Sequence, residues 1–504
     1  MKQDGFRNRY LIKLSSSVFI AVLNIIIQML LPRAFTVEEF GYYSYNLNVF
    51  TSIVGVAMLS VPTALISKFS KRNEEIGLVL FYLKFYLVMV AVLNIAVIGL
   101  YIAGLLQDTF AGQTLSTVLL AMEASIVLNL QNCNIGIFDA MAISRYPAVM
   151  QIALKAAMCI AVTIGFLFGK LNLICFYLIQ ILITGIIAFS MLYEIIKEQK
   201  RRYPMEVNYG CKVYFKEFFE FCRPLIISNI ISQLLVIFMN WTLMHWAGAV
   251  EQAMFGAAWQ LNTLVAYVFS PYAELSKREF AVICKDTEAM RHRYQQALKL
   301  MIWITSYFAI FIGFVSEWLL PVIYGNKYAD AALVTLLMMF YTVYQAWGQL
   351  SGSFQLATEK TKVSAVMGVV GQIIMLGFIF LFQIPNFIWP QGLGAIGIAL
   401  TYLASNLICV NISLIINSRI LKMPFIKNFN IQFFPLLLCS ITTVALKYGI
   451  SALWSGDSTG ALIGKILIAG IIYTAVVGTV IWMHPQLLGV TRDNLKEIVK
   501  KRNG

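Results

Sequence analysis

The stretch GLVLFYLKFYLVMVAVLNIAVIGLYIAGLL, residues 77–106, contains a single charged side chain, Lys84. About 20 such residues in a helix cross a hydrocarbon core of ~30 Å. The polar gap before this stretch contains three basic residues, whereas the gap after it, residues 107–114, contains no Lys or Arg. Apolar stretches separated by gaps that are alternately basic and neutral predict a chain that crosses a membrane repeatedly.

Fourteen apolar segments follow this pattern along the chain. They lie at 10–32, 41–66, 77–106, 115–138, 148–168, 171–196, 224–247, 253–272, 300–324, 331–357, 363–384, 392–417, 432–454 and 461–483. With the N-terminus placed in the cytoplasm, and with Lys13 and Lys465 near segment ends counted with the adjoining side, 31 of the 38 Lys and Arg fall on the cytoplasmic side and four on the opposite side. The other three, Lys84, Lys155 and Lys447, lie inside segments. This bias follows the positive-inside rule. It predicts an all-α polytopic membrane protein with 14 transmembrane helices and both termini cytoplasmic.

The composition excludes several other classes of protein. With 60% hydrophobic and 12% charged residues, the chain is not an ordinary soluble domain. The net charge of +14 follows membrane sidedness instead of forming one patch, so no nucleic-acid partner is expected. The eight cysteines show no CxxC spacing and the three histidines are far apart, so we expect neither a metal site nor a cofactor. The first apolar stretch ends without a small-residue cleavage site and is expected to stay as an anchor.

Short sequence echoes divide the chain into two similar halves. The pair Asn24 and Gln28 reappears as Asn229 and Gln233, in the same spacing and in similar apolar surroundings. Two further short sequence matches between the halves occur in the same order and at similar residue separations. They favour a duplicated six-helix unit in parallel orientation. The predicted divisions are an N-lobe at 1–196, a cytoplasmic linker at 197–223, a C-lobe at 224–417, appended helices at 418–483 and a basic tail at 484–504.

Polar side chains at membrane depth are the candidates for substrate contact, because they are costly there and usually face a bundle interior or a wet cavity. The first segment carries Lys13, Asn24 and Gln28 near one face, and the seventh carries Asn229, Gln233 and Asn240. Two such stripes suggest two walls of one substrate cavity. The alternative is that these amides bond to neighbouring helices and only hold the bundle together.

Four charged residues inside or at the end of segments are further candidates. Lys84 and Lys155 lie about two turns inside the cytoplasmic boundary, where they either form a cationic vestibule for a phosphate-bearing substrate or snorkel to the interface. Glu123 and Asp139 are candidates for coupling Na⁺ or H⁺ binding to transport. Structural pairing is the alternative for Glu123.

Enzyme activity is not expected. The chain contains no Walker A loop, so ATP hydrolysis is disfavoured. The exterior loops are too short to hold the catalytic groups of a membrane glycan polymerase or ligase.

Three motifs resemble the polysaccharide transporter family (O-antigen flippase type) of the multidrug/oligosaccharidyl-lipid/polysaccharide exporter superfamily. They are Leu31-Pro-Arg-Ala-Phe-Thr-Val-Glu-Glu-Phe-Gly-Tyr-Tyr-Ser44, Leu319-Leu-Pro-Val-Ile-Tyr-Gly-Asn-Lys-Tyr-Ala-Asp-Ala-Ala332 and Phe354-Gln-Leu-Ala-Thr-Glu-Lys-Thr-Lys362. The resemblance implies a V-shaped pair of lobes, alternating access and a place in the bacterial cytoplasmic (inner) membrane.

The resemblance also implies the cargo, an undecaprenyl-diphosphate-linked oligosaccharide carried from the inner to the outer leaflet, as in lipopolysaccharide biosynthesis. Implied partners are membrane lipids, a polysaccharide polymerase and a chain-length regulator. A cation-coupled multidrug exporter and a lipid II flippase of the same superfamily are the competing interpretations. The former usually has twelve helices and acidic cavity residues, and the latter several cavity arginines.

Overall fold

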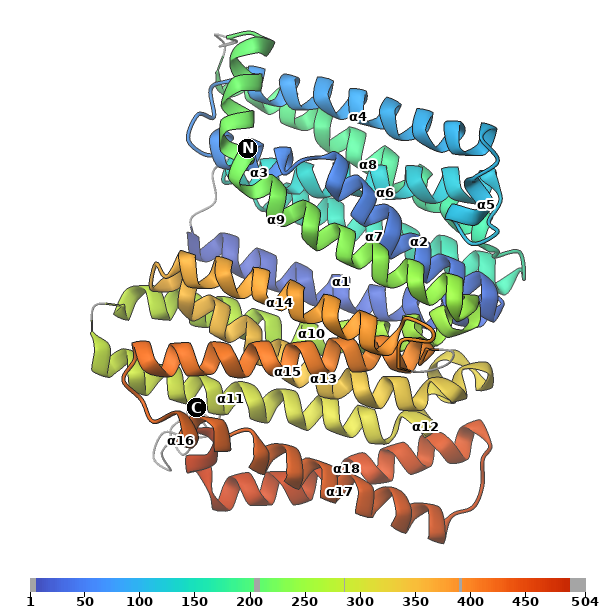
Figure 1. Cartoon of the computed structure of the whole chain (residues 1–504), viewed down its shortest axis with the longest axis vertical. Coiled ribbons are helices and arrows are strands. Elements are labelled where there is room, and N and C mark those ends of the chain that lie inside the picture. The colour runs from blue at the N-terminus through green and yellow to red at the C-terminus, as the bar shows by residue number, and fades with distance from the viewer. Residues whose placement is uncertain (1–5, 204–208, 285, 389–391, 490–504) are drawn as a thin grey trace. The chain divides into compact units, whose positions relative to one another are not determined.

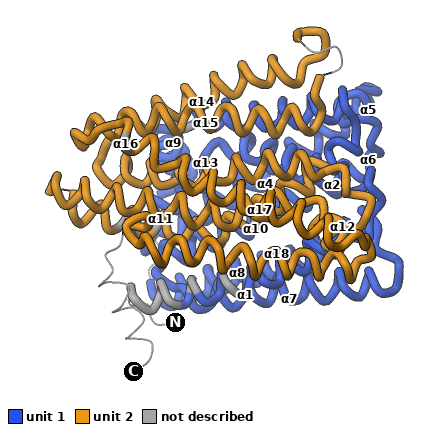
Figure 2. Tube along the Cα trace, turned by 90° about the horizontal axis from the view of Figure 1, so that it is seen from below, with its two compact units in different colours: residues 1–253 blue, residues 254–504 orange. Residues whose placement is uncertain are grey.

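The computed structural model describes residues 6–203, 209–284, 286–388 and 392–489. Within these ranges the regular structure is helical, and no strand occurs. Contacts between Cα atoms divide the chain into two compact units, unit 1 at Met1–Ala253 and unit 2 at Met254–Gly504 (Figure 2).

Unit 1 contains nine α-helices and the first turns of a tenth within its described residues (Figure 1). They are α1 (Phe6–Ala34), α2 (Val37–Ala57), α3 (Val61–Phe69), α4 (Ile76–Ile102), α5 (Leu106–Thr109), α6 (Leu115–Ala140), α7 (Arg145–Leu167), α8 (Leu173–Arg202), α9 (Cys211–Trp246) and the start of α10 (Gly248–Ile283). Helix α1 packs along α7, α6 packs along α8, and α2 packs against both α6 and α9.

Unit 2 contains the rest of α10 and the helices that follow it. They are α11 (Thr287–Phe314), α12 (Ser316–Tyr324), η1 (Asn326–Ala331), α13 (Ala332–Ala357), α14 (Thr361–Phe382), α15 (Gly394–Ile420), α16 (Phe425–Asn430), α17 (Phe433–Leu453), α18 (Thr459–Met483) and η2 (Pro485–Leu488). Helix α13 contacts both α11 and α15, and α14 packs on α15. Helices α17 and α18 lie side by side and contact α11 and α12 respectively (Figure 1).

The structure confirms the all-helical membrane class. Among the described residues, 12 helices are long and apolar enough to span a membrane, or 13 if α2 and α3, bent by 62° at their junction, form one span. The remaining predicted segment, 253–272, lies in α10, a 36-residue helix whose apolar stretch is interrupted by Gln260 and Asn262. Each of the fourteen predicted segments thus lies in helical structure, while 12 or 13 helices among the described residues are long and apolar enough to span a membrane.

Helix α9 is assigned differently by the predicted sequence repeat and by the two compact units of the structure. The repeat places it at the start of the C-lobe, whereas it packs along α2 and contacts α3 and α4, all in unit 1. The repeat-based lobes at 1–196 and 224–417 stay a prediction.

The first family-like motif forms the start of α2. Thr36 caps the helix with a capping box: its Oγ1 accepts from the Glu39 backbone N–H at 3.1 Å, while Glu39 Oε2 accepts from the Thr36 N–H at 3.0 Å. Gly41 follows at the point where α2 passes the α9–α10 junction, and a Cβ there would overlap the carbonyl oxygen of Ala249. This close approach requires glycine at position 41.

Candidate functional site

Helix α1 presents two different faces. Its exposed apolar residues include Phe19, Val22 and Ile26, whereas Asn24 and Gln28 project about 180° away from them on the helical wheel. Both amide side chains are half-buried. The amide stripe of α1 therefore lies away from the helix's exposed apolar face, as both the cavity and the packing interpretation require. Lys13 belongs to α1, but its side chain lies outside the described part of the chain.

The amide stripe of α9 is used for packing. Asn229 Nδ2 donates to the Gly55 carbonyl oxygen of α2 at 3.2 Å, and a Cβ on Gly55 would stand 3.2 Å from the Gln233 side chain. Asn240 is 1% exposed, and its Oδ1 accepts from Asn48 Nδ2 at 3.3 Å and from Gln252 Nε2 at 3.0 Å. These contacts favour the alternative in which the α9 amides hold helices together.

Lys84 lies on the exposed apolar face of α4. Leu87 and Val88, three and four residues further along, are 66% and 56% exposed. The Lys84 side chain is itself exposed, and its Nζ lies 3.7 Å from Cys211 Sγ at the start of α9. A lysine on this face, near the basic end of the helix, fits the snorkelling interpretation better than a vestibule.

Lys155 lies on a different kind of surface, beside a cavity between α1 and α7. Its side chain is half-buried, and it follows by one turn Ile152, which lines a cavity of about 540 Å³. Ser15, Ser16 and Arg145 line the same cavity. Arg145 is the first residue of α7, so the two basic residues are separated by about 15 Å along the helix axis. Arg145 and the two serines therefore line the groove itself, and Lys155 lies about one turn beyond the lining residue Ile152.

The acidic candidates differ in their surroundings. Glu123 Oε1 accepts a hydrogen bond from Asn94 Nδ2 at 2.7 Å, and this bond links α6 to α4. The structural alternative for Glu123 is thereby favoured. Asp139 lies half-buried near the end of α6 that the basic loops flank. Within the described ranges, His, Cys, Asp and Glu do not gather in groups of three or more that could hold a metal ion.

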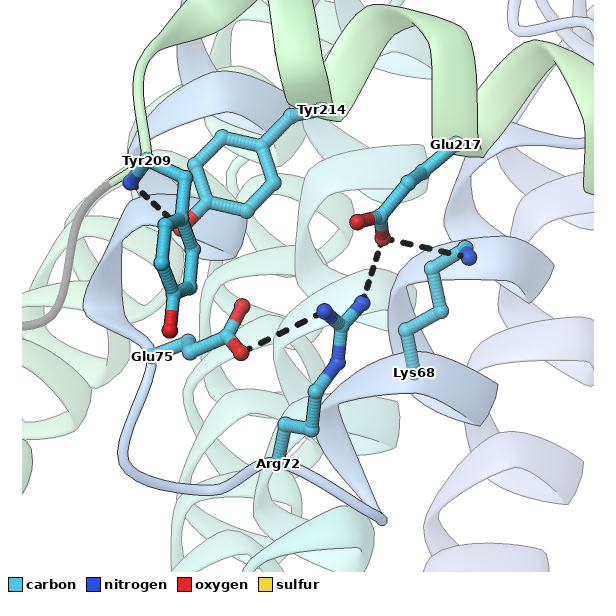
Figure 3. A network of polar contacts seen from close by, with 6 residues as sticks. All are labelled: Lys68, Arg72, Glu75, Tyr209, Tyr214 and Glu217. Carbon is cyan, nitrogen blue, oxygen red and sulfur yellow. Dashed lines mark hydrogen bonds and ion pairs between the residues drawn. The ribbon is translucent and has the colours of Figure 1, made fainter.

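A network of charged residues connects the start of α9 to the turn between α3 and α4 (Figure 3). The Glu217 carboxylate accepts from Arg72 Nη2 at 2.6 Å and from Lys68 Nζ at 3.4 Å. Arg72 also pairs with Glu75 at 3.3 Å. Lys68 and Arg72 therefore form an internal clamp with Glu217 and are not free to bind a substrate anion.

Tyr214 completes the clamp from the same helix. Its hydroxyl accepts a hydrogen bond from the Tyr209 backbone N–H at 3.2 Å, and a Cβ at Gly77 would stand 2.5 Å from that hydroxyl (Figure 3). Arg72 holds the pKa of the Glu217 carboxyl below its ordinary value by a direct hydrogen bond, against the opposing effect of burial. The clamp is thus built around an ionised Glu217.

Sequence reasoning missed Arg145, Ser15 and Ser16. Arg145 was counted only as one of the cytoplasmic basic residues, because its place in a short gap gave no sign that α7 lies along α1. Its position at the first turn of an apolar segment, ten residues before Lys155, is the signal that would have grouped the two.

Comparison with solved structures identifies the fold of the chain. Among solved structures, the lipid II flippase MurJ in an inward closed conformation superposes with a TM-score of 0.69 over 94% of this chain and 99% of that one, at 16% sequence identity. An inward-facing multidrug resistance MATE family transporter of the MOP superfamily superposes with a TM-score of 0.64, covering 82% of this chain and 98% of that one, at 13% identity. At these identities the likeness establishes the fold. Curated proteins gave no match.

The chain is therefore a multi-pass membrane protein with the fold shared by these transporters. A family model described as polysaccharide biosynthesis protein matches residues 8–276, more than half of the chain, and the chain belongs to that family. The resemblance found in the three motifs is thereby confirmed.

Proposed function

We propose that the protein is a flippase that moves an undecaprenyl-diphosphate-linked oligosaccharide, an O-antigen or related repeat unit, from the inner to the outer leaflet. The observation that carries this proposal is membership of the polysaccharide biosynthesis protein family in a chain with at least twelve helices that could span a membrane. The fold shared with a lipid II flippase supports lipid-linked cargo, and the fold shared with a MATE transporter supports alternating access.

In this proposal the groove between α1 and α7 receives the diphosphate. Arg145, Ser15 and Ser16 line the groove, and Lys155 adds positive charge about one turn beyond the lining residue Ile152. The Ser15 hydroxyl donates to the Ile12 carbonyl oxygen at 3.1 Å, so the basic side chains carry the proposal. Lysine acts on phosphate as a point charge, and arginine adds bidentate geometry. Asn24 and Gln28, which project from the face of α1 opposite the groove-lining Phe19, would bond to sugar hydroxyls at a separate place, while the polyprenyl tail remains in lipid.

Binding of this cargo would drive a change between inward-open and outward-open states only by favouring one of them. Asp139, half-buried near the basic end of α6, remains the candidate for coupling to Na⁺ or H⁺. We further propose fourteen spans, cytoplasmic termini and a bacterial inner-membrane location, with a polysaccharide polymerase and a chain-length regulator as partners.

Complementation tests this proposal. The gene is expressed in a bacterium that lacks its own O-antigen flippase, and surface glycan and accumulated lipid-linked units are measured. The proposal predicts restored surface glycan and a fall in the accumulated units. Well-expressed protein that fails with several different glycan units would contradict it, and resistance to cationic drugs in the same strain would favour the multidrug exporter.

A further inference from the structure

Three aromatic rings from three helices of unit 2 form one cluster. Trp259 of α10 lies 5.3 Å from Tyr402 of α15 and 6.4 Å from Tyr341 of α13, and the two tyrosine rings are 5.2 Å apart. Trp259 and Tyr402 are half-buried, and Tyr341 is 8% exposed. Phe255 of α10 also packs against this cluster, 5.8 Å from Trp259 and 6.0 Å from Tyr402, so that Trp259 and Tyr402 are covered in part but not fully buried.

The cluster lies near the middle of the membrane. At 1.5 Å per residue, Trp259, Tyr341 and Tyr402 are about 16, 14 and 12 Å from the first residues of their helices. Half of a hydrocarbon core is ~15 Å. Tryptophan and tyrosine are commonest at the two interfaces of a membrane, so a group of them at this depth is unusual.

Two amides lie one turn further along the same helix faces. Gln345 follows Tyr341 by four residues on α13, and Asn406 follows Tyr402 by four on α15. Asn406 is directed toward α13, since its Oδ1 would be 3.8 Å from a Cβ at Gly348, one turn from Gln345. The two amides thus converge beside the ring cluster.

Both amides have buried atoms without partners. Gln345 Oε1 and Asn406 Nδ2 find no hydrogen-bond partner among the residues that the structure describes. An unsatisfied buried polar atom destabilises the folded state, and a membrane offers no bulk water to satisfy it. One atom is an acceptor and the other a donor, so a hydroxyl group, which is both, suits the pair.

From this arrangement we infer that the rings of Trp259 and Tyr402, with Gln345 and Asn406, form a binding site for a pyranose ring of the cargo. The inference rests on the proposed function and assigns the sugar to unit 2. The apolar face of the sugar stacks on the accessible aromatic surface, and its hydroxyls bond to the two amides. Ligand sites commonly combine aromatic walls with a few directed polar groups in this way.

The chemistry of the site favours a sugar over a cationic drug. Neither the three rings nor the two amides carry a charge, whereas a desolvated cation requires a counter-charge or a closed aromatic cage. Purely structural amides would be expected to bond to each other or to a helix backbone, as Asn229 and Asn240 do in unit 1. Gln345 and Asn406 differ from Asn229 and Asn240 in that each has a buried polar atom without a partner among the described residues.

Binding measurements on the full-length protein in lipid nanodiscs test the inference. The probes are the undecaprenyl-diphosphate-linked repeat unit from the complemented host and undecaprenyl diphosphate without sugar. The wild type is expected to bind the sugar-bearing lipid about tenfold more tightly, a ratio in the range of a few stacking and hydrogen-bond contacts. Trp259→Ala and Asn406→Leu should each remove most of that ratio and leave the affinity for the sugar-free lipid unchanged.

Asn406→Leu separates a binding role from a structural one. It removes an unpaired buried polar atom at similar volume, so the midpoint of thermal unfolding should stay equal or rise while the sugar-dependent affinity falls. Tyr448→Ala, at a 71% exposed aromatic of α17, is the matched control and should change neither. Unchanged affinity ratios in both site variants would overturn the inference.

The inference and the proposed function can fail separately. If the wild type restores surface glycan but binds the two lipids equally, the sugar site is refuted and the flippase proposal stands. If the wild type neither restores glycan nor binds either lipid, the proposed function fails and the sugar site with it.

Discussion

The clamp around Glu217 gives a prediction that can be worked through in detail. Glu217→Gln removes the charge that faces Arg72 and Lys68 at 2.6 and 3.4 Å. A hydrogen bond to a charged group contributes about 1.5–3 kcal/mol, and the Glu217 side chain is 30% exposed, so solvent screening reduces this value. We expect a loss of about 1.5 kcal/mol, which corresponds to about tenfold more frequent local opening.

Hydrogen–deuterium exchange of the first three turns of α9, residues 211–223, measures that opening directly. Exchange there should become about tenfold faster in Glu217→Gln, while α13 in unit 2 keeps its wild-type rate. Glu220→Gln is the matched control, because Glu220 lies three residues away on the same helix with an exposed side chain. Equal protection in Glu217→Gln and the wild type would refute the account of the clamp.

The same clamp has a defined pH dependence. The folded-state pKa of Glu217 is lowered, chiefly by Arg72, so its contribution is complete above the pKa of a glutamate in the unfolded chain, ~4.3. It is lost as the pH falls through the lower folded-state pKa. Exchange rates of the wild type and of Glu217→Gln should therefore converge in acid and differ at neutral pH.

Three further predictions test other parts of the structure, and two of them include a control substitution. Gly41→Ala should lower the midpoint of thermal unfolding, with a destabilisation of about 3 kcal/mol from the backbone clash, whereas Gly99→Ala, which meets no atom within 4 Å, should stabilise by about 0.5–1 kcal/mol; equal effects would contradict the close approach. Thr36→Ala removes the N-cap of α2 and should cost about 1 kcal/mol, measured by the same unfolding assay. Lys155→Ala should reduce surface glycan in the complementation assay at equal membrane abundance while Lys84→Ala should not, and the reverse result would place the phosphate site on α4.

The positions of most spanning helices could be predicted from the sequence, because bilayer thickness sets the length of a spanning helix whatever it packs against. The predicted number of fourteen spans is not confirmed, since 12 or 13 helices among the described residues are long and apolar enough. The break between α2 and α3 was not predicted. There the residues Leu59 and Ser60 adopt positive φ angles, and neither residue type is typical of such a conformation. The segment 41–66 therefore looked like one helix.

The candidate site was only partly accessible to sequence reasoning. Periodicity identified which side chains share one face of a helix, as for Asn24 and Gln28. It could not identify the helix that this face meets, and so gave Asn229 the same role as Asn24. The structure identifies the partner of Asn229, because α9 packs along α2 and Asn229 donates a hydrogen bond to the Gly55 carbonyl oxygen there. The cluster of Trp259 with Tyr341 and Tyr402 depends on contacts between three helices and has no local sequence signal.

Translocation by the purified protein tests the central claim most directly. The protein is reconstituted into liposomes that contain an undecaprenyl-diphosphate-linked oligosaccharide, with a Na⁺ or a H⁺ gradient imposed, and exposure of the glycan to a membrane-impermeant lectin is followed over time. The account predicts that the glycan on the inner leaflet becomes accessible only in liposomes that contain the protein, and more slowly with Lys155→Ala. Folded protein that leaves the inner-leaflet glycan inaccessible under both gradients would contradict it.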